Sequence, residues 1–524
     1  MSKFDFNPEK FKAQLRQVAA ELAAGKDYDK VIRRYPKTKT TLFTKADVIA
    51  GLRHFGYPGK MLAKPIRTMS GVVPVTLLTK PYPCPGKCIF CPDDVRMPKS
   101  YLSAEPGAQR AAANNFDPYN QVTSRLQTYY ANNHTTDKVE LIILGGTWSA
   151  YPLPYKLWFI ARCFEALNEF KPVKKLTRPQ ISGTAEWPRL LKAQSINETA
   201  VCRCVGLSIE TRPDFITLGQ LIELRKMGCT KIQIGIQSLD NRVLKLNRRG
   251  HTNASTRKAI VLLRQFGFKI QAHWMANLYG STPKKDIADF AKLFSQKWYR
   301  PDELKIYPCS LIATAELMAY YKKGLWRPYS QTELMKVMVN VLPLVAEYCR
   351  VSRMIRDFSG DDIVVGNKIT NFRQLVEAKA KKIKEIRFRE IRSQLVRPKD
   401  LRLKMITYKT SIGREKFLQW VTKTNQIAGF LRLSLPRRNV GPPIKELQGA
   451  AVIRELHVYG HALSLGGLGK TQHLGLGRQL LFKARVLAAG YKKLSVISSI
   501  GTREYYRRHG FSSGELYQYL KLVD

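Results

Sequence analysis

Short apolar runs of strand length alternate with amphipathic segments through the middle of the chain, and this alternation restricts the fold more than any other feature. The strand-like runs occur at residues 73–78, 139–144, 205–209, 231–236, 269–275 and 303–307. Segments with helical spacing separate most of them, at residues 218–228, 253–267 and 284–294. Buried strands joined through helices form a parallel sheet whose functional groups gather at the carboxyl ends of the strands. We therefore expect an α/β fold whose parallel sheet is either open or curved into a partial (β/α) barrel.

At 524 residues the chain is too long for one hydrophobic core, and its patterns divide it into four parts. These are a basic helical N-terminal segment, the barrel, a basic linker and a second α/β domain, at residues 1–70, 71–350, 351–400 and 401–524. Further helices are expected at residues 331–350 and 377–394. The last part has strand patterns at 426–433, 450–459 and 493–498 and one helix pattern at 476–489.

The chain is strongly basic, with 88 Lys and Arg against 40 Asp and Glu and a net charge of +48. The excess is large in residues 1–70, with 15 basic and 6 acidic residues, and in residues 373–438, with 19 and 5. Two basic regions far apart in sequence suit a large folded nucleic acid that touches several faces of the protein. An anionic membrane surface and a merely solvated basic surface are the alternatives.

The sequence gives no sign of a membrane segment. No apolar run approaches the roughly 18 residues that span a bilayer, and the start, MSKFDFNPEKFKAQ, has no signal-peptide pattern. We expect a cytoplasmic protein without a membrane partner. Thiols stay reduced in that compartment, so clustered cysteines hold metal more often than they form disulfides.

Three of the nine cysteines lie within eight residues, in the stretch CPGKCIFC that follows the first predicted strand. They are Cys84, Cys88 and Cys91. A structural zinc site normally needs four protein ligands, and no second CxxC or nearby HxxxH supplies the fourth. An iron–sulfur cubane held by three thiolates leaves one iron open. The spacing CxxxCxxC is the known signature of a [4Fe-4S] cluster that binds S-adenosylmethionine at the open iron and cleaves it to a 5′-deoxyadenosyl radical. Zinc and unligated thiols are the alternatives.

The ends of the next strands carry residues suited to S-adenosylmethionine. Glycines let a backbone approach the methionine amino group, while charged and amide side chains suit its carboxylate and ribose. The candidates are Gly145, Gly146 and Thr147 after the second strand, Glu210 and Arg212 after the third, and Gln237 after the fourth. Ordinary polar residues at strand ends are the alternative interpretation.

The last part of the chain has its own glycine-rich loop, QHLGLGRQLL at residues 472–481. Such a loop at a helix start presents backbone N–H groups to a pyrophosphate, here that of coenzyme A. The order of strand, glycine loop, long helix, strand and aromatic helix is that of acyl-CoA acetyltransferase (GNAT-like) domains. A plain turn is the alternative for the loop. Tyr505 and Tyr506 suit a core position equally well, and His457 suits a satisfied strand histidine better than a general base.

The two halves together resemble the catalytic subunit of Elongator, a tRNA carboxymethyluridine synthase. The resemblance rests on ordered matches that include KPIRTMSGVVPVTLLTKPYPCPGKCIFCP at 64–92, DKVELIILGGTW at 137–148, SIETRPD at 208–214, KIQIGIQSLD at 231–240, RELHVYG at 454–460, QHLGLG at 472–477 and SVISSIGTREYYRRHGF at 495–511. It implies that the radical activates the methyl group of acetyl-CoA, which then adds to C5 of the wobble uridine, U34, of tRNA. It also implies an external one-electron reductant, and leaves a homodimer and accessory Elongator-type subunits open.

Residue roles carry over from this resemblance. It implies cluster ligation and catalysis by Cys84, Cys88 and Cys91, with Tyr505 and Tyr506 as further catalytic candidates. It implies acetyl-CoA contacts at Lys138, Glu455, Leu456, His457, Val458, Gln472, Gly475, Leu476, Gly477, Arg478 and Tyr506. Ile383, Glu385 and Phe388 occupy positions where family members carry zinc-binding cysteines, so we expect no structural zinc. Residues 461–471 also diverge, in the region that would cover acetyl-CoA.

Two other functions compete with tRNA modification. A protein lysine acetyltransferase would keep its acetyl transfer when the three cysteines become serine. A tRNA-binding scaffold without chemistry would bind tightly in a salt-sensitive way and release no 5′-deoxyadenosine.

Overall fold

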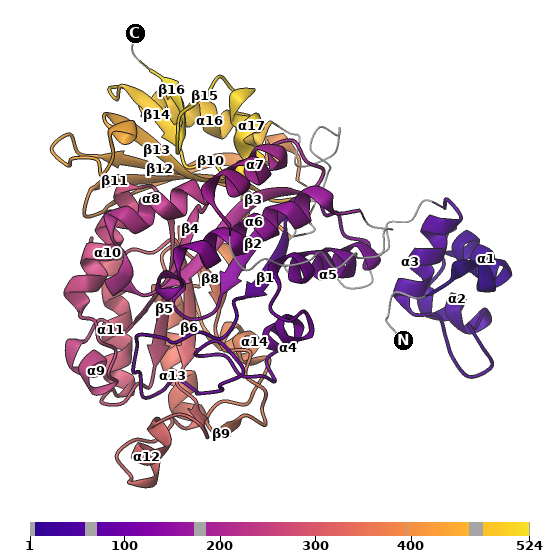
Figure 1. The fold of residues 1–524 in the computed structure, drawn as a ribbon, viewed down its shortest axis with the longest axis horizontal. Coiled ribbons are helices and arrows are strands. Elements are labelled where there is room, and N and C mark those ends of the chain that lie inside the picture. Colours follow the sequence, from indigo (N-terminus) through magenta and orange to yellow (C-terminus); the bar gives the residue numbers. More distant parts are fainter. Residues whose placement is uncertain are drawn as a thin grey trace.

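Two seven-stranded sheets form the body of the protein, and a small helical bundle stands to one side (Figure 1). The computed structural model describes residues 6–57, 71–171, 185–392, 394, 396–460 and 475–522. None of the helices in these residues combines the length and apolar content that crossing a bilayer requires.

The first sheet is parallel throughout, with the strand order β1-β2-β3-β4-β5-β6-β8. Its strands are β1 (Val73–Leu78), β2 (Lys138–Leu144), β3 (Arg203–Thr211), β4 (Lys231–Gln237), β5 (Lys269–Ala276), β6 (Glu303–Pro308) and β8 (Arg350–Arg353). The edge strands β1 and β8 do not pair with each other, so the barrel is partial. All six predicted strands are confirmed. A small two-stranded sheet pairs β7 (Leu311–Ile312) with β9 (Ile363–Val365).

Helices follow most barrel strands and cover the outside of the sheet (Figure 1). They are α4 (Pro106–Ala113), α5 (Pro118–Ala131), α6 (Leu153–Glu169), α7 (Trp187–Asn197), α8 (Leu218–Lys226), α9 (Asn241–Leu246), α10 (Asn253–Gln265), α11 (Pro283–Ser295), α12 (Leu317–Lys322) and α13 (Gln331–Val341). Threonine side chains cap α8, α10 and α11 by accepting a backbone N–H of the first turn. The helices at 218–228, 253–267 and 284–294 are thus confirmed, with their ends shifted by a few residues.

The barrel interior is polar. On β6, Leu304 and Ile306 are fully buried on the helix side, whereas Glu303, Lys305 and Tyr307 face the interior, where they line cavities. The alternation follows from the two-residue period of a strand. Barrels of this type are usually filled by branched apolar side chains. A polar interior therefore indicates a chamber that holds polar ligands rather than a packed core.

Two helix predictions are wrong in part. The helix expected over 331–350 ends at Val341, because the following turn, Leu342–Leu344, contains Pro343 and Arg350 already begins β8. The helix expected over 377–394 is two helices, α14 (Phe372–Lys379) and α15 (Ile386–Arg389). Lys382 lies between them at a φ of 59°, and Glu385 restarts the helix by accepting the backbone N–H groups of Arg387 and Phe388.

The C-terminal sheet has the order β10-β11-β12-β13-β14-β16-β15, with only β13 and β14 parallel. Its strands are β10 (Arg402–Lys409), β11 (Gly413–Val421), β12 (Ile427–Pro436), β13 (Ala450–Val458), β14 (Lys493–Val496), β15 (Ser512–Ser513) and β16 (Gln518–Lys521). α16 (Leu476–Leu487) packs on β12 and β13, and α17 (Arg503–Arg507) carries the two predicted tyrosines. The sequence predicted β12 to β14 and α16, but it missed β10, β11, β15 and β16.

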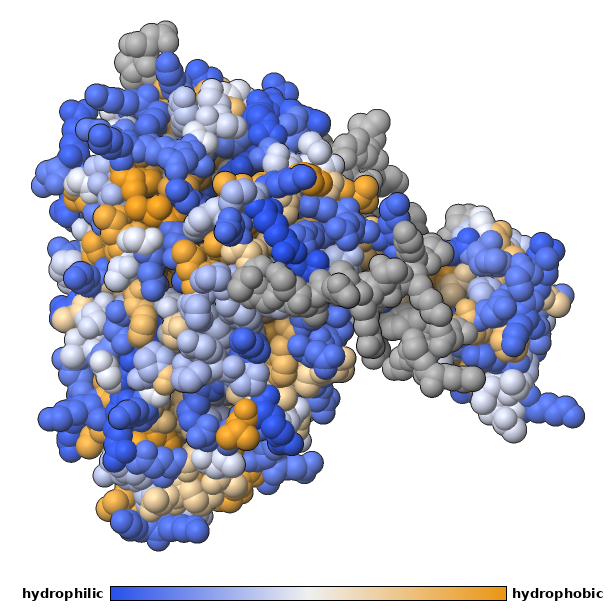
Figure 2. Space-filling model, in the orientation of Figure 1, coloured by the Kyte–Doolittle hydropathy of each residue, from blue (hydrophilic) through white to orange (hydrophobic). Residues whose placement is uncertain are grey.

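The N-terminal bundle comprises a short 3-10 helix (Pro8–Phe11), α1 (Lys12–Ala23), α2 (Tyr28–Arg34) and α3 (Lys45–His54), so the predicted helices are confirmed. It has a small core of its own around Val18, Phe43 and Val48. Arg53 joins it to the body by donating to the Tyr130 carbonyl at 2.7 Å and to Asn133 Oδ1 at 2.7 Å, beside the end of α5. The face of the molecule seen in Figure 2 is mainly hydrophilic, and its apolar side chains form small groups.

The C-terminal sheet covers the amino ends of the barrel strands. Gly267, just before β5, lies so close to Val452 of β13 that a Cβ on it would come within 2.8 Å of the valine side chain. Ser499, after β14, donates to the Cys204 carbonyl of β3 at 2.8 Å. One continuous apolar core runs from the barrel helices into β11, β12 and β13. The carboxyl ends of the barrel strands, where functional groups are expected, lie at the opposite end.

Candidate active site

The three clustered cysteines lie in the loop that follows β1, at the carboxyl end of the barrel. Arg249 donates to Cys88 Sγ at 3.1 Å, and the backbone N–H of Gly86 donates to Cys84 Sγ at 3.4 Å. Cys91 Sγ lies 3.0 Å from Ser100 Oγ. The hydrogen bond from Cys91 and the nearby guanidinium groups of Arg249 and Arg212 lower the pKa of the Cys88 thiol, although its burial opposes them. The same contact, together with burial, raises the pKa of the Cys91 thiol, so within this pair the thiolate, which is the form that binds iron, is favoured at Cys88.

A cavity of about 100 Å³ lies against these thiols. The residues predicted to bind S-adenosylmethionine line it: Gly146, Thr147, Glu210, Arg212 and Gln237. They come from the ends of β2, β3 and β4, as the parallel sheet requires. Gly145 lies beside this group, although it is not itself among the lining residues. The structure therefore brings together what the sequence placed on successive strands.

The chemistry of this cavity fits a polar cofactor. Gly145 has a φ of 141°, and a Cβ on it would lie 1.8 Å from Thr79 Oγ1, so no larger residue is accommodated there. A Cβ on Gly86 would lie 2.3 Å from Arg212 Nη1. In the described residues, Arg212 Nη1 and Gln237 Oε1 are buried without a hydrogen-bond partner. Buried polar atoms normally have partners, so a bound ligand is expected to supply them.

The cysteines do not converge on a single point. Within the described ranges no three His, Cys, Asp or Glu side chains are placed to hold one metal ion. Thiolates of a cubane each bind a different iron, so a cluster does not need such convergence. The thiols and the cavity beside them thus fit a [4Fe-4S] cluster with S-adenosylmethionine.

Several cavity residues escaped sequence reasoning. They are Tyr101, Arg249, His273, Lys305, Arg353 and Arg356. His273 and Lys305 are inward-facing residues of β5 and β6, and a closer use of strand alternation would have found both. Arg249 and Arg356 lie outside strands and helices, where the sequence offers no spacing signal.

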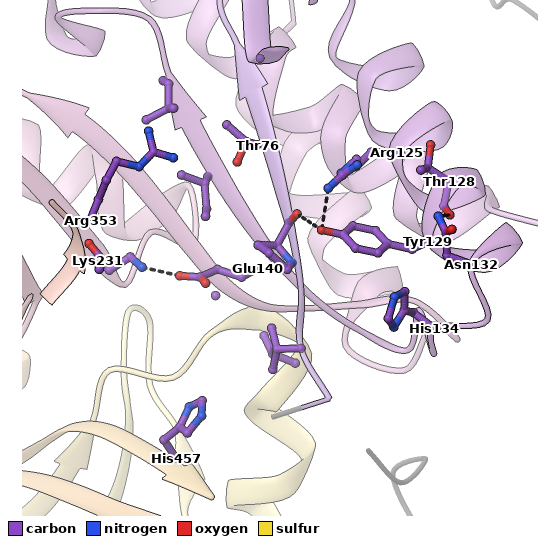
Figure 3. A pocket seen from close by; sticks show the side chains of 18 of the residues that line it. Thr76, Arg125, Thr128, Tyr129, Asn132, His134, Glu140, Lys231, Arg353 and His457 are labelled. Carbon is purple, nitrogen blue, oxygen red and sulfur yellow. Dashed lines mark hydrogen bonds and ion pairs between the residues drawn. The ribbon is translucent and has the colours of Figure 1, made fainter. Parts of the chain in front are cut away.

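A much larger cavity, of about 1600 Å³, occupies the barrel interior and extends to the C-terminal sheet. Figure 3 shows Glu140, Lys231 and Arg353 reaching into it from the barrel, with His457 facing them from β13. Residues of α5 and of the N-terminal bundle line its outer part. The two cavities share the lining residues Tyr101, Glu105, Leu144, Lys305 and Arg353. We call this shared group the dividing wall.

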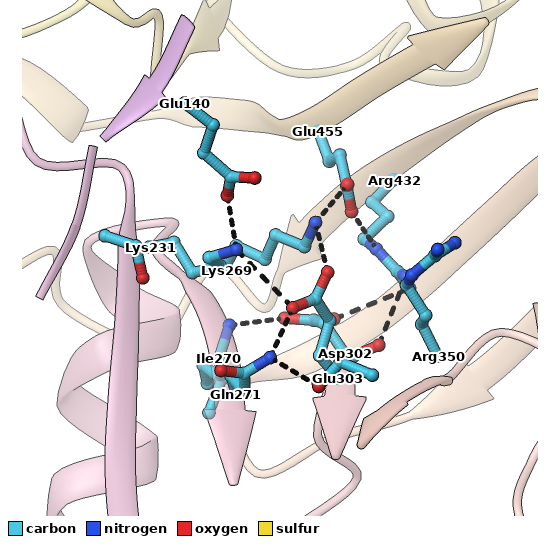
Figure 4. Close-up of polar contacts among 12 residues, drawn as sticks. Glu140, Lys231, Lys269, Ile270, Gln271, Asp302, Glu303, Arg350, Arg432 and Glu455 are labelled. Atoms are coloured by element: carbon cyan, nitrogen blue, oxygen red, sulfur yellow. Dashed lines mark hydrogen bonds and ion pairs between the residues drawn. The ribbon is translucent and has the colours of Figure 1, made fainter. Parts of the chain in front are cut away.

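A layer of ion pairs crosses the amino end of the barrel (Figure 4). We call it the floor layer: Glu140, Lys231, Lys269 and Glu303. Lys269 Nζ lies 2.7 Å from Glu303 Oε1 and also pairs with Glu455 of β13. Burial raises the pKa of the Glu303 carboxyl, but Lys231 and Lys269 lower it by more, so the group stays ionised. The floor layer therefore ties the barrel to the C-terminal sheet.

Residues predicted to contact acetyl-CoA fall into three groups, of which the first lines the large cavity. Leu456, His457, Glu455 and Tyr506 line the large cavity. The Glu455 carboxylate is occupied by Lys269 and by Arg432, whose Nε lies 2.7 Å away. Burial lowers the pKa of His457 to about 4, so its ring is neutral near pH 7.

The glycine loop and the tyrosines pack together beside that cavity. Gly475 is the first residue before α16 and has a φ of 69°. A Cβ on Gly477 would lie 2.9 Å from Tyr505 OH, and burial raises the pKa of Tyr505 to about 12. Tyr506 is buried in the core of the C-terminal sheet.

The remaining predicted residues lie apart from this group or outside the described residues. Leu476, the first residue of α16, is buried, and Arg478 of the same helix is exposed. Val458 ends β13, and Lys138 begins β2 without lining either cavity. Gln472 and the divergent stretch 461–471 lie outside the described residues.

The three positions where zinc-binding cysteines were expected hold other side chains. Ile383 packs against the main core, and Phe388 is exposed. Glu385 is fully buried and pairs with Arg373 at 2.7 Å. The absence of structural zinc stays a prediction.

Comparison with known families defines the class of protein. Residues 82–294 match the model of the radical SAM superfamily, and residues 301–382 match that of the radical SAM C-terminal domain. Together with the partial barrel and the cysteine loop, these matches define a radical S-adenosylmethionine enzyme with an additional C-terminal α/β sheet. Its cofactors are a [4Fe-4S] cluster and S-adenosylmethionine.

Individual relatives define the family. The chain is 38% identical to a tRNA uridine(34) acetyltransferase of Dehalococcoides mccartyi, over 85% of this chain and 96% of the relative. It is 32% identical to human Elongator complex protein 3, over 86% and 84%. The solved structure of an N-terminally truncated Elp3 from Methanocaldococcus infernus superposes with a TM-score of 0.73 at 34% identity, covering 87% of this chain and all of that one. The chain belongs to the Elongator complex protein 3 family, as its sequence resemblance predicted.

Proposed function

We propose that this enzyme forms carboxymethyluridine at the wobble position of tRNA, U34, with acetyl-CoA as the source of the new carbon atoms. The relatives named as tRNA uridine(34) acetyltransferases support the reaction, since they match nearly the whole chain. The observation that carries the proposal is the dividing wall. The S-adenosylmethionine cavity and the large cavity that reaches the C-terminal sheet meet at this wall. S-adenosylmethionine and the acetyl group of acetyl-CoA could therefore be brought to the same uridine.

Cys84, Cys88 and Cys91 would hold the cluster, and Gly145, Gly146, Thr147, Glu210, Arg212 and Gln237 would hold S-adenosylmethionine. When bound, these cofactors supply a 5′-deoxyadenosyl radical able to take a hydrogen atom from a methyl group. Arg249, which donates to Cys88 Sγ at 3.1 Å, would help the Cys91 contact to favour the thiolate form of Cys88. The residues that line the cavity are buried or half-buried, which would limit the access of water and protect a reactive species from side reactions.

Acetyl-CoA would lie along β13 and the start of α16, with its acetyl end in the large cavity. Leu456, His457 and Tyr506 line that part of the chamber. The neutral His457 ring stacks on Phe430 with centroids 5.6 Å apart, which suits a positioning role better than proton transfer. Orientation of this kind is worth several kcal/mol of a reaction barrier, about 7–11 at most.

The tRNA would approach from the side of the N-terminal bundle. Lys10 and Lys37 of the bundle and Arg110 and Arg125 of the barrel helices line the outer part of the large cavity. Cations in such a position attract the phosphate backbone and make binding sensitive to salt. We assign residues 1–70 to tRNA binding, 71–350 to radical chemistry, 351–400 to a basic linker and 401–524 to acetyl-CoA.

An anaerobic assay tests the proposal. The cluster is reconstituted, dithionite, S-adenosylmethionine, acetyl-CoA and tRNA are added, and the digested tRNA is analysed by mass spectrometry. We expect carboxymethyluridine at position 34 with the native protein and none with Cys88→Ser. Acetylated lysine peptides with unmodified uridine would favour a protein acetyltransferase instead. Salt-sensitive tRNA binding without 5′-deoxyadenosine would favour a scaffold.

A further inference from the structure

The dividing wall carries an inward-facing cation whose hydrogen-bonding capacity is not used up. Lys305 lies in the middle of β6, and its side chain lines both cavities. A lysine ammonium has three N–H donors and no acceptor. Within the described part of the chain it makes one hydrogen bond, from Nζ to Gln233 Oε1 at 2.6 Å. Its other donors are left for a group in the space between the cavities.

Rigid elements hold this cation in place. Gln233 Nε2 donates to Ser208 Oγ at 2.8 Å, which turns the amide oxygen of Gln233 toward Lys305. Ser208, Gln233 and Lys305 come from β3, β4 and β6, whose backbones are fixed by the sheet. A donor supported by strands is positioned more accurately than a donor on a loop. The Lys305 ammonium is therefore suited to donating a hydrogen bond to one specific acceptor atom of a ligand.

The neighbouring strand adds a histidine with one ring nitrogen, Nε2, that has no hydrogen-bond partner in the described residues, while its Nδ1 lies 3.8 Å from Glu210 Oε1. This residue, His273 of β5, is paired in register with Lys305 of β6, and its side chain is only 4% exposed. Burial lowers the pKa of His273 well below 6.5, so the ring is neutral. Tyr307 packs edge-on against it, with ring centroids 5.9 Å apart. A ligand with several polar atoms and a flat ring fits these surroundings.

We propose that the dividing wall binds the target base of the tRNA, and that Lys305 selects uracil over cytosine by donating a hydrogen bond to O4 of the base. This inference rests on the proposed function, because it names how that site recognises its substrate. Uracil has an acceptor, O4, where cytosine has an amino group that only donates. An ammonium group therefore satisfies uracil and opposes cytosine. A base read in this way must be turned out of its stack into the protein.

The same contact orients the reacting atom. O4 and C5 of uracil are attached to neighbouring positions of the ring, C4 and C5. A base held through O4 at Lys305 thus keeps C5 beside the wall. The S-adenosylmethionine cavity begins on the other side of this wall. Lys305 is a specificity-determining residue in this account, and it also positions the base.

Binding to the reconstituted full-length protein tests the inference. Fluorescence anisotropy gives the Kd of labelled tRNA with U34 and of the same tRNA with C34, for the native protein, Lys305→Met and Lys305→Arg. We expect the native protein to prefer U34 by at least about tenfold, which is about 1.4 kcal/mol. Lys305→Met should bind both tRNAs alike, and Lys305→Arg should keep part of the preference because it retains donors. Lys156→Met is the matched control, since Lys156 is a buried lysine that pairs with Glu223 and lines neither cavity.

Several outcomes would overturn the inference. One is a native-like preference in Lys305→Met, and another is no preference in the native protein. A higher KM for acetyl-CoA with an unchanged base preference would assign Lys305 to the thioester instead. Loss of cluster absorbance in Lys305→Met would indicate a structural role. Failure of the proposed function is separate: the native protein would then prefer U34 in binding but leave it unmodified in the mass spectrum.

Discussion

Arg454 of β13 forms an ion pair with Asp302, which immediately precedes β6, and both side chains are completely buried. Arg432 of β12 also faces Asp302, at 3.6 Å. Burial raises the pKa of Asp302, but the three guanidinium groups of Arg454, Arg432 and Arg264 outweigh it and bring the pKa to about 2. The Asp302 carboxylate, just before β6 in the barrel, thus neutralises Arg432 and Arg454 of the C-terminal sheet.

The first prediction concerns this pair. Asp302→Ala should lower the stability of the protein by about 3–5 kcal/mol, because it leaves buried arginine charge uncompensated. A lower urea midpoint of unfolding measures the loss. Asp400→Ala is the control: Asp400 pairs with Arg397 on the surface, and its removal should leave the midpoint unchanged. An equal midpoint for Asp302→Ala would show that the pair does not join the sheets.

The depressed pKa of Asp302 also sets a pH dependence. A carboxyl whose folded pKa lies below its unfolded value, about 3.9, stabilises the protein fully above that value. This contribution is lost as the pH falls through about 2, where the folded group takes up its proton. The native protein should lose more urea resistance than Asp302→Asn when the pH is lowered from 5 to 3. Parallel losses would contradict the assignment.

The second prediction separates the cluster from the C-terminal sheet. Cys84→Ser, Cys88→Ser and Cys91→Ser should each remove cluster iron and abolish 5′-deoxyadenosine formation, because each thiol is a ligand. Acetyl-CoA affinity should remain within about twofold of the native value, since the cysteines lie at the opposite end of the barrel. Iron analysis and calorimetric titration measure the two effects. A variant that keeps a full cluster would remove its cysteine from the ligand set.

The third prediction concerns the glycine after β2. Gly145→Ala should weaken S-adenosylmethionine binding at least about tenfold, because the backbone has a φ of 141° and the new Cβ would overlap Thr79 Oγ1. Gly219→Ala is the control, because Gly219 lies in α8 with no atom within 4 Å of the added Cβ. Equilibrium dialysis with the reconstituted protein provides the affinity. A native affinity for S-adenosylmethionine in Gly145→Ala would show that binding does not depend on the close approach of Gly145 to Thr79.

The fourth prediction follows from the titration of Lys305. Burial lowers its pKa to about 8, despite the opposing charge of Glu210. Above pH 8 the neutral amine gains a lone pair and can accept from the cytosine amino group, so the preference for U34 should fall between pH 7 and 9. The charged or titratable groups around it are Tyr101, Glu105, Glu210, Lys231, His273, Tyr307, Arg353 and Arg356. Lys305→Arg should keep a constant preference over this range, and a native preference that also stays constant would argue against the titration.

The barrel was predictable because strand alternation and helix spacing are local patterns. Each of the six runs, such as 231–236, is apolar enough to be buried on its helix side, and the cysteine spacing is specific by itself. The strand β10 escaped because it lies at the sheet edge, where exposed residues such as Leu403 and Met405 blur the pattern. The helix at 377–394 was overextended because the local sequence does not reveal that Glu385 caps a new turn.

The residues of the S-adenosylmethionine cavity were predictable only where a sequence motif is typical of that ligand. Gly146, Glu210 and Arg212 line one cavity as expected, because parallel strands end at the same edge. Glu455 illustrates the limit: its position on β13 was clear, but its pairing with Lys269 joins segments 186 residues apart. Strand alternation places Lys305 and His273 on the inward side of the sheet, but sequence alone does not tell an open barrel interior from a packed one.

The floor layer connects the barrel and the C-terminal sheet through shared ion pairs. The Lys269 ammonium pairs with Glu303 of the barrel and with Glu455 of β13. A substitution of Lys269 would therefore disturb the barrel and the C-terminal sheet together. Changing the C-terminal sheet to accept a new acyl donor would therefore need compensating changes in the barrel. Neither domain can be expressed alone without replacing the ionic partner that the other domain supplies.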